Sequence, residues 1–293
     1  MQLATDEFLD FLSTEKGFSK NTIAAYRNDL AQFGSFVERQ TSPTVDRETI
    51  LAFILELKEK RYAATTIARK IAAVRSYFHY LVGKGFVRQD PTEDLDSPKI
   101  GRSLPRAISV AEVDKLLQAA GAGATPESLR DRAMLELLYA TGMRVSELVA
   151  LDVEDVNVFA GCVRCSGRGG RERVIPVEFH KMSSVDRYTR EARPLLLRRP
   201  EQQALFLNHR GERLTRQGFW LIIKGHAKRA GIHSTITPHT LRHSFAAHQI
   251  SSGAELKALQ EILGHASISS TQVYTQVSAE RLRREWEQAH PLA

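Results

Sequence analysis

The sequence contains little cysteine, no long hydrophobic run, no internal repeat and no low-complexity tract. Its two cysteines, Cys162 and Cys165, form a lone C-x-x-C, and no further ligands at suitable spacing lie nearby in sequence. A structural zinc site needs four ligands, so no metal is predicted. In a strand these two side chains point to opposite faces, and we expect two reduced thiols. A transmembrane helix is also excluded, because no stretch of about eighteen apolar residues occurs.

The composition allows a nucleic-acid partner without requiring one. The 293 residues, 42% of them hydrophobic and 26% charged, are enough for one large or two ordinary domains. The net charge is +7, and the excess is uneven: Lys and Arg number 15 against 14 Asp and Glu up to Pro105, and 26 against 20 beyond it. A basic protein of this kind can bind a polyanion. The acidic start, MQLATDEFLDFL, lacks the features of a signal peptide, so we expect a cytoplasmic protein.

The first ninety residues predict helices only. Apolar residues recur at helical spacing over about 19–38, with Ser19 as the N-cap. Asp46 or Thr49 can open a second helix through Lys60, and a third spans about 64–82. A bundle of such helices buries its apolar stripes and leaves a polar, partly basic outside. Three basic residues of the last helix lie off its stripe: Arg69, Lys70 and Arg75.

The remainder predicts a linker and a second domain of a different class. Residues 91–106 hold three prolines and no periodicity, which is typical of an interdomain linker. Beyond it the pattern predicts helices, then a small antiparallel sheet, then helices again from Thr215. The expected fold is therefore mainly α with two domains, a helical bundle at 1–90 and an α+β domain at 107–293. The expected helices and strands of the second domain lie at about 109–120, 126–141, 153–158, 161–165 and 173–177, and the turn 167–171 joins the last two strands.

A first motif, Ala-Thr-Gly-Met-Arg-Val-Ser-Glu-Leu, spans residues 140–148. Gly142 is expected to end one helix and Ser146 or a neighbour to begin the next, which places Arg144 in the turn between them. An arginine held in this way can present its planar fork to a phosphate, and Glu147 is near enough to orient it. A surface ion pair is the plainer interpretation of this motif alone.

A second motif, Thr-Pro-His-Thr-Leu-Arg-His, spans residues 237–243. Proline suits the first turn of a helix, so His239 and Arg242 share one face near a helix N-terminus, where an anion is favoured. By itself this motif is also compatible with an ordinary capped helix start.

A third motif, Leu-Gly-His-Ala-Ser, spans residues 263–267 and is followed by a tyrosine nine residues after the histidine. Gly264 breaks a helix and places His265 on a turn, and Ser267 can cap the short helix that presents Tyr274. A single tyrosine is more often a packed side chain than a nucleophile.

Together these residues occur in the order Arg144, His239, Arg242, His265, Tyr274. In this order and context the sequence resembles the tyrosine recombinase (phage integrase) family, whose pattern is T-G-x-R-x-S-E-L, H-x-L-R, G-H and a tyrosine nine residues beyond. The stretch GFSKNTIAAYRNDLAQF also resembles the SAM-like core-binding domain of the bacterial Xer chromosome-dimer resolvases. The ending RLRREWEQAHPLA is similar to their C-terminal helix and tail.

The resemblance implies a cofactor-free transesterification. Tyr274 is expected to attack a DNA phosphate and form a 3′-phosphotyrosine, while a 5′ hydroxyl leaves. A phenol has a pKa of about 10, and His239 matches the base that takes its proton. Arg144 and Arg242 match the donors that hold the phosphate oxygens, and His265 matches a further hydrogen-bond donor.

One position departs from the family pattern. In the family a lysine within G-K-G-x-K-E-R protonates the leaving oxygen, whereas residues 167–173 read GRGGRER here, with Arg171 in the place of that lysine. An arginine is a poor proton donor, although it can stabilise developing charge. Arg171 is kept as a candidate catalytic residue. Two alternatives stay open: a water or another residue is the proton source, or the basic turn only touches the DNA backbone.

The resemblance implies a site-specific recombinase that binds double-stranded DNA with short inverted half-sites. It is expected to assemble as a homo- or hetero-tetramer on two duplexes and to exchange strands through a Holliday junction. A second recombinase or an activator protein are further candidate partners. Chromosome-dimer resolution is expected, because no arm-binding domain precedes the bundle. A mobile-element integrase and a catalytically weakened DNA-binding protein of recombinase ancestry are the alternatives. The candidate DNA contacts of the N-terminal domain are Lys20, Asn21, Thr22, Arg27, Arg69 and Arg75.

Overall fold

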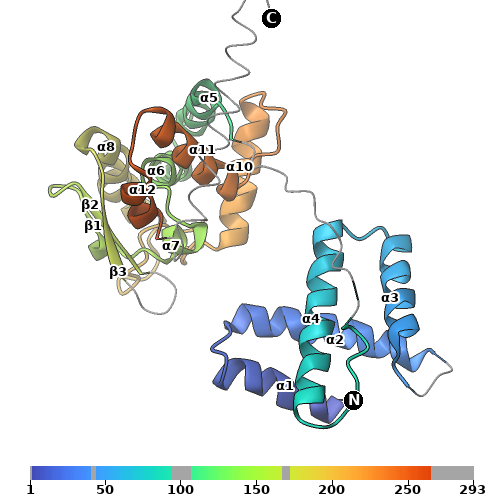
Figure 1. Ribbon diagram of the computed structural model, residues 1–293. Coiled ribbons are helices and arrows are strands. Elements are labelled where there is room, and N and C mark those ends of the chain that lie inside the picture. The colour runs from blue at the N-terminus through green and yellow to red at the C-terminus, as the bar shows by residue number, and fades with distance from the viewer. Residues whose placement is uncertain (1, 41–43, 94, 96–106, 167–171, 265–293) are drawn as a thin grey trace, which may run out of the picture. The chain divides into compact units, whose positions relative to one another are not determined.

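The computed structural model describes residues 2–40, 44–93, 95, 107–166 and 172–264, and the chain divides into two compact units, Met1–Arg102 and Ser103–Ala293 (Figure 1). Most of the expected linker, 91–106, lies outside the described residues. The same holds for three candidate catalytic residues: Arg171, His265 and Tyr274.

The described part of the first unit contains helices and no strand, as predicted. Ser19 caps the second helix by accepting a hydrogen bond from the backbone N–H of Thr22, and Asp46 caps the third by accepting from that of Thr49. The predicted apolar stripes are buried, with Phe33 and Phe53 packed edge to face at a centroid distance of 5.1 Å. The first helix was not predicted as a separate element. The helices are α1 (Gln2–Thr14), α2 (Lys20–Glu38), α3 (Arg47–Glu59) and α4 (Ala64–Gly83).

A buried ion pair joins α2 to α4. Asp29 is 1% exposed and accepts from Lys70 Nζ at 2.9 Å and from the guanidinium of Arg69. The prediction that Lys70 lies on the basic outside is therefore wrong. Periodicity places Lys70 off the main apolar stripe, but the carboxylate of Asp29 draws its ammonium into the interior, where a buried charge requires a partner.

The second unit surrounds α6 (Pro126–Thr141), which packs against α5, α8 and α11 (Figure 1). The predicted helices 109–120 and 126–141 are confirmed, with Ser109 and Thr125 as N-caps, and Thr215 caps α10 as expected. The stretch 178–214, for which no element was predicted, contains α8, a π-helical turn at Tyr188–Ala192 and α9. The remaining helices are α5 (Val110–Gly121), α7 (Val145–Ala150), α8 (Phe179–Arg187), α9 (Arg193–Leu196), α10 (Arg216–Arg229), α11 (Pro238–Ser251) and α12 (Leu256–Leu263).

A small antiparallel sheet lies at one side of this unit, in the order β1 (Val156–Asn157), β2 (Cys162–Ser166), β3 (Glu172–Pro176). The prediction of a strand from residue 153 is wrong for its first half. Residues 153–155 form a 3₁₀ turn, because the backbone N–H of Asp152 donates to Asp155 Oδ2 at 3.0 Å and closes that turn.

Both cysteines lie on β2 and are free thiols, as expected. Cys162 is half-buried, whereas Cys165 is buried on the other face of the strand. Burial raises the pKa of the Cys165 thiol to about 11, so this thiol stays protonated. In the described ranges, no helix is long and apolar enough to cross a lipid bilayer.

We predict that Asp29→Ala lowers the free energy of unfolding by about 3 kcal/mol or more, because it leaves the ammonium of Lys70 buried without its carboxylate. Asp6→Ala is the matched control: Asp6 pairs with Arg27 at 2.7 Å, but both side chains are more than half exposed. Its loss is expected to stay below about 1 kcal/mol. Urea unfolding of the full chain, followed by far-UV circular dichroism, measures both losses. Equal losses would contradict the buried pair as a source of stability.

Candidate active site

The turn that carries Arg144 is defined by a glycine. Gly142 ends α6 in the left-handed conformation, with φ of +58°, and a Cβ there would lie 2.2 Å from the ring of Phe245. Only glycine meets both conditions without strain. The chain then starts α7 at Val145, with Arg144 as the N-cap residue. The prediction that Arg144 lies between two helices is confirmed.

Glu147 orients Arg144 through two contacts. The backbone N–H of Arg144 donates to Glu147 Oε2 at 2.7 Å, and Arg144 Nη1 donates to Glu147 Oε1 at 3.0 Å. The side chain of Arg144 remains 37% exposed, whereas that of Glu147 is 5% exposed. The guanidinium is therefore anchored on its buried side and open to solvent on another, as a binding group for an anion requires.

Arg242 lies on α11, whose start is built as the sequence predicts. Thr237 is the N-cap and Pro238 occupies the first turn. Arg242 is only 5% exposed, and its Nη1 and Nη2 donate to the carbonyls of Gly142 at 2.6 Å and Leu263 at 2.7 Å. It thereby connects α11 to the ends of both α6 and α12.

A third arginine, Arg173 on β3, was not predicted as a site residue. Its Nη1 and Nη2 donate to the two carboxylate oxygens of Glu147, each at 2.9 Å, and its Nε donates to the carbonyl of Ile262 at 2.8 Å. The side chain is 16% exposed. The sequence offered only its position in a basic turn motif, since its partners are 26 and 89 residues away.

Arg144, Arg173 and Arg242, here called the arginine cluster, converge on the last turn of α12. Arg173 donates to the carbonyl of Ile262, Arg242 to that of Leu263, and Arg144 Nη2 to that of Gly264 at 3.0 Å. The last carbonyls of a helix have no intrahelical partner and carry partial negative charge, so cations stabilise this end. Glu147 is a carboxylate partner of two of these guanidiniums. Three guanidiniums around one such carboxylate leave an excess of positive charge that favours an anion.

The carboxylate of Glu147 is ionised in this setting. Burial alone would raise its pKa, but the hydrogen bonds from Arg173 and from the backbone of Arg144, with the charges of both arginines, hold the pKa below the ordinary value. Glu147 therefore stays charged at neutral pH and balances part of the arginine cluster.

Two histidines of α11 lie beside Arg242. The rings of His239 and His243 have centroids 6.4 Å apart, and His239 is the exposed one of the two. Burial, then the charges of His239 and Arg242, lower the pKa of His243 to about 4. His243 is thus neutral at physiological pH, and His239 is the histidine that faces solvent.

The predicted DNA contacts of the first unit differ in how far they are available. Lys20 and Asn21 are exposed at the start of α2, and Thr22 is half-buried beside the Ser19 cap. The arginines have partners within the unit: Arg27 pairs with Asp6, Arg69 pairs with Asp29, and half-buried Arg75 donates to the carbonyl of Leu95.

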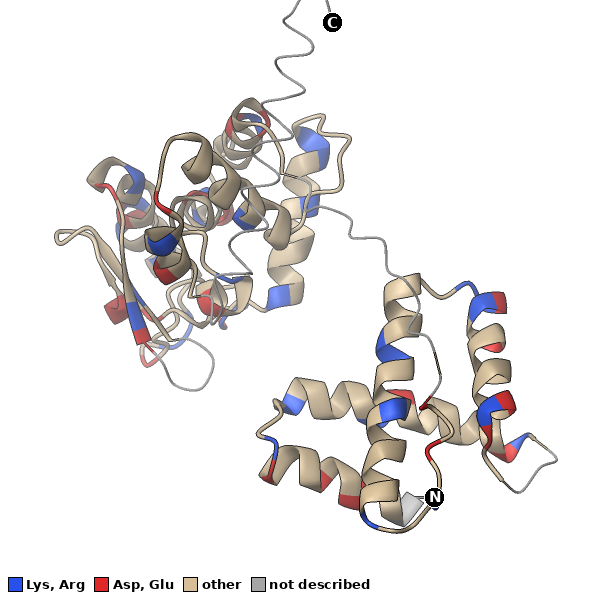
Figure 2. Cartoon of the chain, in the orientation of Figure 1, with Lys and Arg blue, Asp and Glu red and all other residues tan. Residues whose placement is uncertain are grey.

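An exposed basic and aromatic face on α10 was not predicted; Figure 2 shows several Lys and Arg positions on this helix. Arg216, Trp220 and Lys224 are exposed and spaced four residues apart, and the ammonium of Lys224 lies 5.1 Å from the centre of the Trp220 ring. The signal was present as R-x-x-x-W-x-x-x-K, but only the helix boundaries show that the three share a face.

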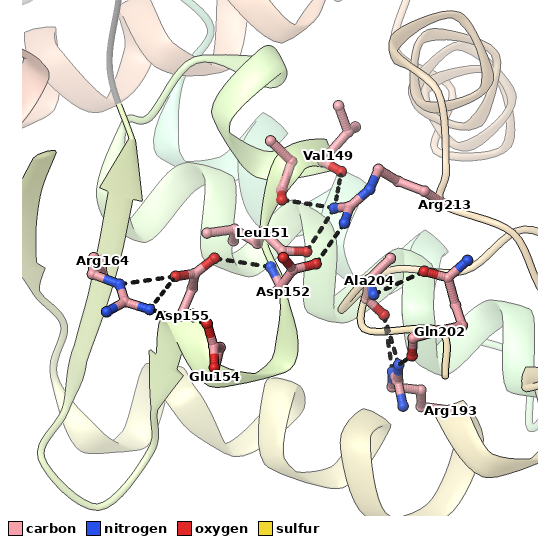
Figure 3. Close-up of polar contacts among 11 residues, drawn as sticks. Val149, Leu151, Asp152, Glu154, Asp155, Arg164, Arg193, Gln202, Ala204 and Arg213 are labelled. Atoms are coloured by element: carbon pink, nitrogen blue, oxygen red, sulfur yellow. Dashed lines mark hydrogen bonds and ion pairs between the residues drawn. The ribbon is translucent and has the colours of Figure 1, made fainter. Parts of the chain in front are cut away.

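The position of α7 also depends on Arg213, whose guanidinium lies among the carbonyls at the C-terminal end of this helix (Figure 3). Arg213 Nη1 donates to the carbonyls of Val149, Ala150 and Leu151 at 2.7 to 3.0 Å, and its Nη2 donates to Asp152. This guanidinium caps the C-terminus of α7, as the arginine cluster caps that of α12. Within the described part of the chain, no three His, Cys, Asp or Glu side chains gather closely enough to hold a metal ion.

Both units match known protein families, and the chain has similar relatives of nearly full length. Residues 5–85 match the family model for the phage integrase N-terminal SAM-like domain, and residues 106–281 match that of the phage integrase family. A tyrosine recombinase XerC from Herpetosiphon aurantiacus is 55% identical over 284 residues, 96% of this chain and 92% of the relative. A tyrosine recombinase XerD from Listeria innocua is 46% identical, covering 98% of both chains. The solved structure of XerH bound to palindromic difH substrate, in a post-cleavage complex, has a TM-score of 0.74 at 23% identity, covering 97% of this chain and 85% of that one.

We predict that Gly142→Ala destabilises the protein more than Gly231→Ala. Both glycines have φ near +60°, so both variants lose roughly 1–2 kcal/mol to left-handed strain. A Cβ at Gly231 meets nothing within 4 Å, whereas a Cβ at Gly142 overlaps Phe245 and adds roughly 1–3 kcal/mol of overpacking. Chemical denaturation of the two variants measures the difference, and an equal loss would show that the close approach of Phe245 is unimportant.

Proposed function

The chain belongs to the phage integrase family of tyrosine recombinases, and on that premise we propose that it is a site-specific recombinase that forms a 3′-phosphotyrosine through Tyr274. The oxygen of Tyr274 attacks the phosphorus, the bond from phosphorus to the 5′ oxygen breaks, and that oxygen takes up a proton. Attack by the 5′ hydroxyl of another strand reverses the step and rejoins the DNA. The observation that carries the proposal is the convergence of Arg144 and Arg242 on the last turn of α12, directly before His265.

Each candidate side chain has one role in this proposal. Arg144 and Arg242 hold the non-bridging oxygens of the phosphate, where negative charge grows in the transition state. His239, exposed on α11, takes the proton of the tyrosine. His265 donates a further hydrogen bond to the phosphate, and Arg171 stabilises the charge on the leaving oxygen. No cofactor is needed, because the phosphotyrosine conserves the energy of the phosphodiester.

We propose chromosome-dimer resolution as the biological role, through a Holliday junction held by a homo- or hetero-tetramer on two duplexes with short inverted half-sites. The names and high identity of the XerC and XerD relatives support this choice over a mobile-element integrase. A second recombinase and an activator protein are proposed as partners, and the cytoplasm, where a bacterial chromosome lies, as the place of action.

The proposed DNA contacts come from both units. On the first unit they are Lys20, Asn21, Thr22, Arg27, Arg69 and Arg75, of which Lys20 and Asn21 are exposed at the start of α2. On the second unit the exposed face of α10 offers two cations for phosphates and an aromatic ring for packing on sugar or base. Arg75 is the weakest of the set, because its contact with the carbonyl of Leu95 already engages its guanidinium.

A second candidate function is DNA binding with weakened catalysis. Arg171 favours it, because an arginine stands where the family has a proton-donating lysine. The complete pair of phosphate-binding arginines favours catalysis. The two functions differ in whether a covalent bond to DNA forms.

We predict that the wild-type protein, mixed with DNA of its target site carrying a nick near the cleavage point, forms a covalent protein–DNA complex that survives denaturing electrophoresis. The nick allows a short fragment to diffuse away, which traps the phosphotyrosine. Tyr274→Phe abolishes the complex because it removes the attacking oxygen, whereas Tyr80→Phe, a matched loss of a hydroxyl on α4, leaves it. A stable non-covalent complex without any covalent product would favour the weakened DNA-binding protein instead.

We predict that Arg171→Lys forms the covalent complex faster, by up to about 10²-fold, the lower range for a general acid. Arg168→Lys, in the same turn, is the matched control and is expected to change the rate little. A substrate with sulfur in place of the bridging 5′ oxygen leaves as a thiolate, which has a pKa of about 8.5 and needs no acid. The advantage of Arg171→Lys should vanish on that substrate. No advantage on the oxygen substrate would show that proton transfer is not limiting.

A further inference from the structure

Arg173 has no role in the chemistry proposed above, yet its guanidinium links three elements that lie next to candidate catalytic residues in the sequence. It lies on β3, two residues after Arg171 in the sequence. Through Glu147 it is bound to α7, whose N-cap residue is Arg144. Through the carbonyl of Ile262 it is bound to the last turn of α12, two residues before Gly264.

The geometry of Arg173 argues against direct contact with DNA phosphate. Its Nη1 and Nη2 donate to the two carboxylate oxygens of Glu147 at 2.9 Å, and its Nε donates to the carbonyl of Ile262 at 2.8 Å. Its side chain is less than half as exposed as that of Arg144, at 16% against 37%. A guanidinium held bidentately by a buried carboxylate is fixed in place and cannot turn toward a ligand without breaking these bonds.

The turn after α12 is shaped around the same guanidinium. Gly264 has φ of +62°, and a Cβ at this position would lie 3.0 Å from Arg173 Nη1. The backbone conformation therefore favours glycine, and a Cβ there would press on the guanidinium of Arg173. The backbone carbonyl of Gly264 in turn accepts from Arg144 Nη2, so the two arginines contact adjacent parts of one turn.

Arg173 also sets how strongly Glu147 attracts Arg144. Glu147 accepts from both guanidiniums, and Arg173 supplies two of the hydrogen bonds to its carboxylate. Without Arg173 the whole charge of a buried carboxylate would face Arg144 alone. Arg144 would then be drawn toward Glu147 and displaced from the place where negative charge develops in the transition state.

We propose that Arg173 is a positioning residue for phosphotyrosine formation: it fixes Arg144 and the last turn of α12 relative to one another and does not touch the DNA. The inference rests on the proposed function. It assigns Arg173 a role in the rate of the covalent step and none in DNA affinity.

The test is single-turnover formation of the covalent complex on nicked target DNA, at increasing concentrations of the full chain. Arg173→Lys keeps the charge but loses the planar fork, so it cannot bind both oxygens of Glu147 and Ile262 together. The maximum rate is expected to fall by about 10²-fold, as for a catalytic group displaced by about 1 Å. The half-saturating concentration is expected to change less than about twofold, because the DNA contacts are retained.

Arg164→Lys is the matched control. Arg164 is an arginine of the same sheet, on β2, in an ion pair with Asp155 at 3.0 Å, and it contacts none of the groups that bind Arg173. This variant is expected to keep the wild-type maximum rate. Glu147→Gln serves as the second test variant if Arg173→Lys does not fold, since it weakens the same fork and should also lower the maximum rate at constant half-saturation.

Two results would overturn the inference. The first is a maximum rate for Arg173→Lys equal to that of Arg164→Lys. The second is an unchanged maximum rate with a weakened half-saturation, which would make Arg173 a DNA contact. Failure of the wild type to form any covalent complex would refute the proposed function separately. In that case amide hydrogen exchange tests the positioning role of Arg173. Faster exchange at the end of α12 in Arg173→Lys than in Arg164→Lys supports that role, and equal exchange overturns it.

Discussion

The last turn of α12 has carbonyl oxygens that the helix itself cannot satisfy, and three arginines from three other elements donate to them. This is the constraint on which the rest of the site depends. Arg144, Arg173 and Arg242 come from positions far apart in the sequence, and the carbonyls of residues 262–264 bring their positive charges together. The carboxylate of Glu147 binds two of these guanidiniums and offsets their mutual repulsion. The chain before His265 is therefore bound by Arg144 and Arg242, the side chains proposed to hold a phosphate.

The same physical device recurs at α7. Six residues are too few for an independent helix, and α7 is held from both ends. At its start Glu147 accepts from the backbone and side chain of Arg144, and at its end Arg213 caps the last carbonyls (Figure 3). A short helix fixed in this way presents Arg144 at a defined place without a long apolar stripe. The arginines of this unit thus act as structural caps as well as candidate ligands, because one planar group with five N–H donors can serve several acceptors.

This double use bears on how an anion would bind. The carbonyl and carboxylate contacts use only part of the donor set of Arg144, whose side chain remains more than a third exposed. A phosphate could therefore be added to a guanidinium that is already oriented, which lowers the reorganisation needed when charge develops. The charge of Glu147 also matters. This carboxylate stays ionised because the hydrogen bonds and charges of its arginine partners offset the cost of burying it. The site is positive enough to favour an anion, while its arginines remain partly neutralised in the free protein.

The sequence by itself determined the class of the fold, most helix starts and the turns at Gly142 and Gly264, because caps and left-handed glycines depend on neighbouring residues. It also determined the order of the candidate catalytic residues and hence the family. Only the tertiary structure decided that Lys70 is buried against Asp29, that residues 179–196 are helical, and that Arg173 belongs to the site. Each of these depends on partners from distant parts of the chain. The carboxylate of Asp29 binds the ammonium of Lys70, and the core orders a weakly periodic segment. The guanidinium of Arg173 binds Glu147 and the carbonyl of Ile262. No local pattern encodes such contacts, since they exist only once the elements have packed.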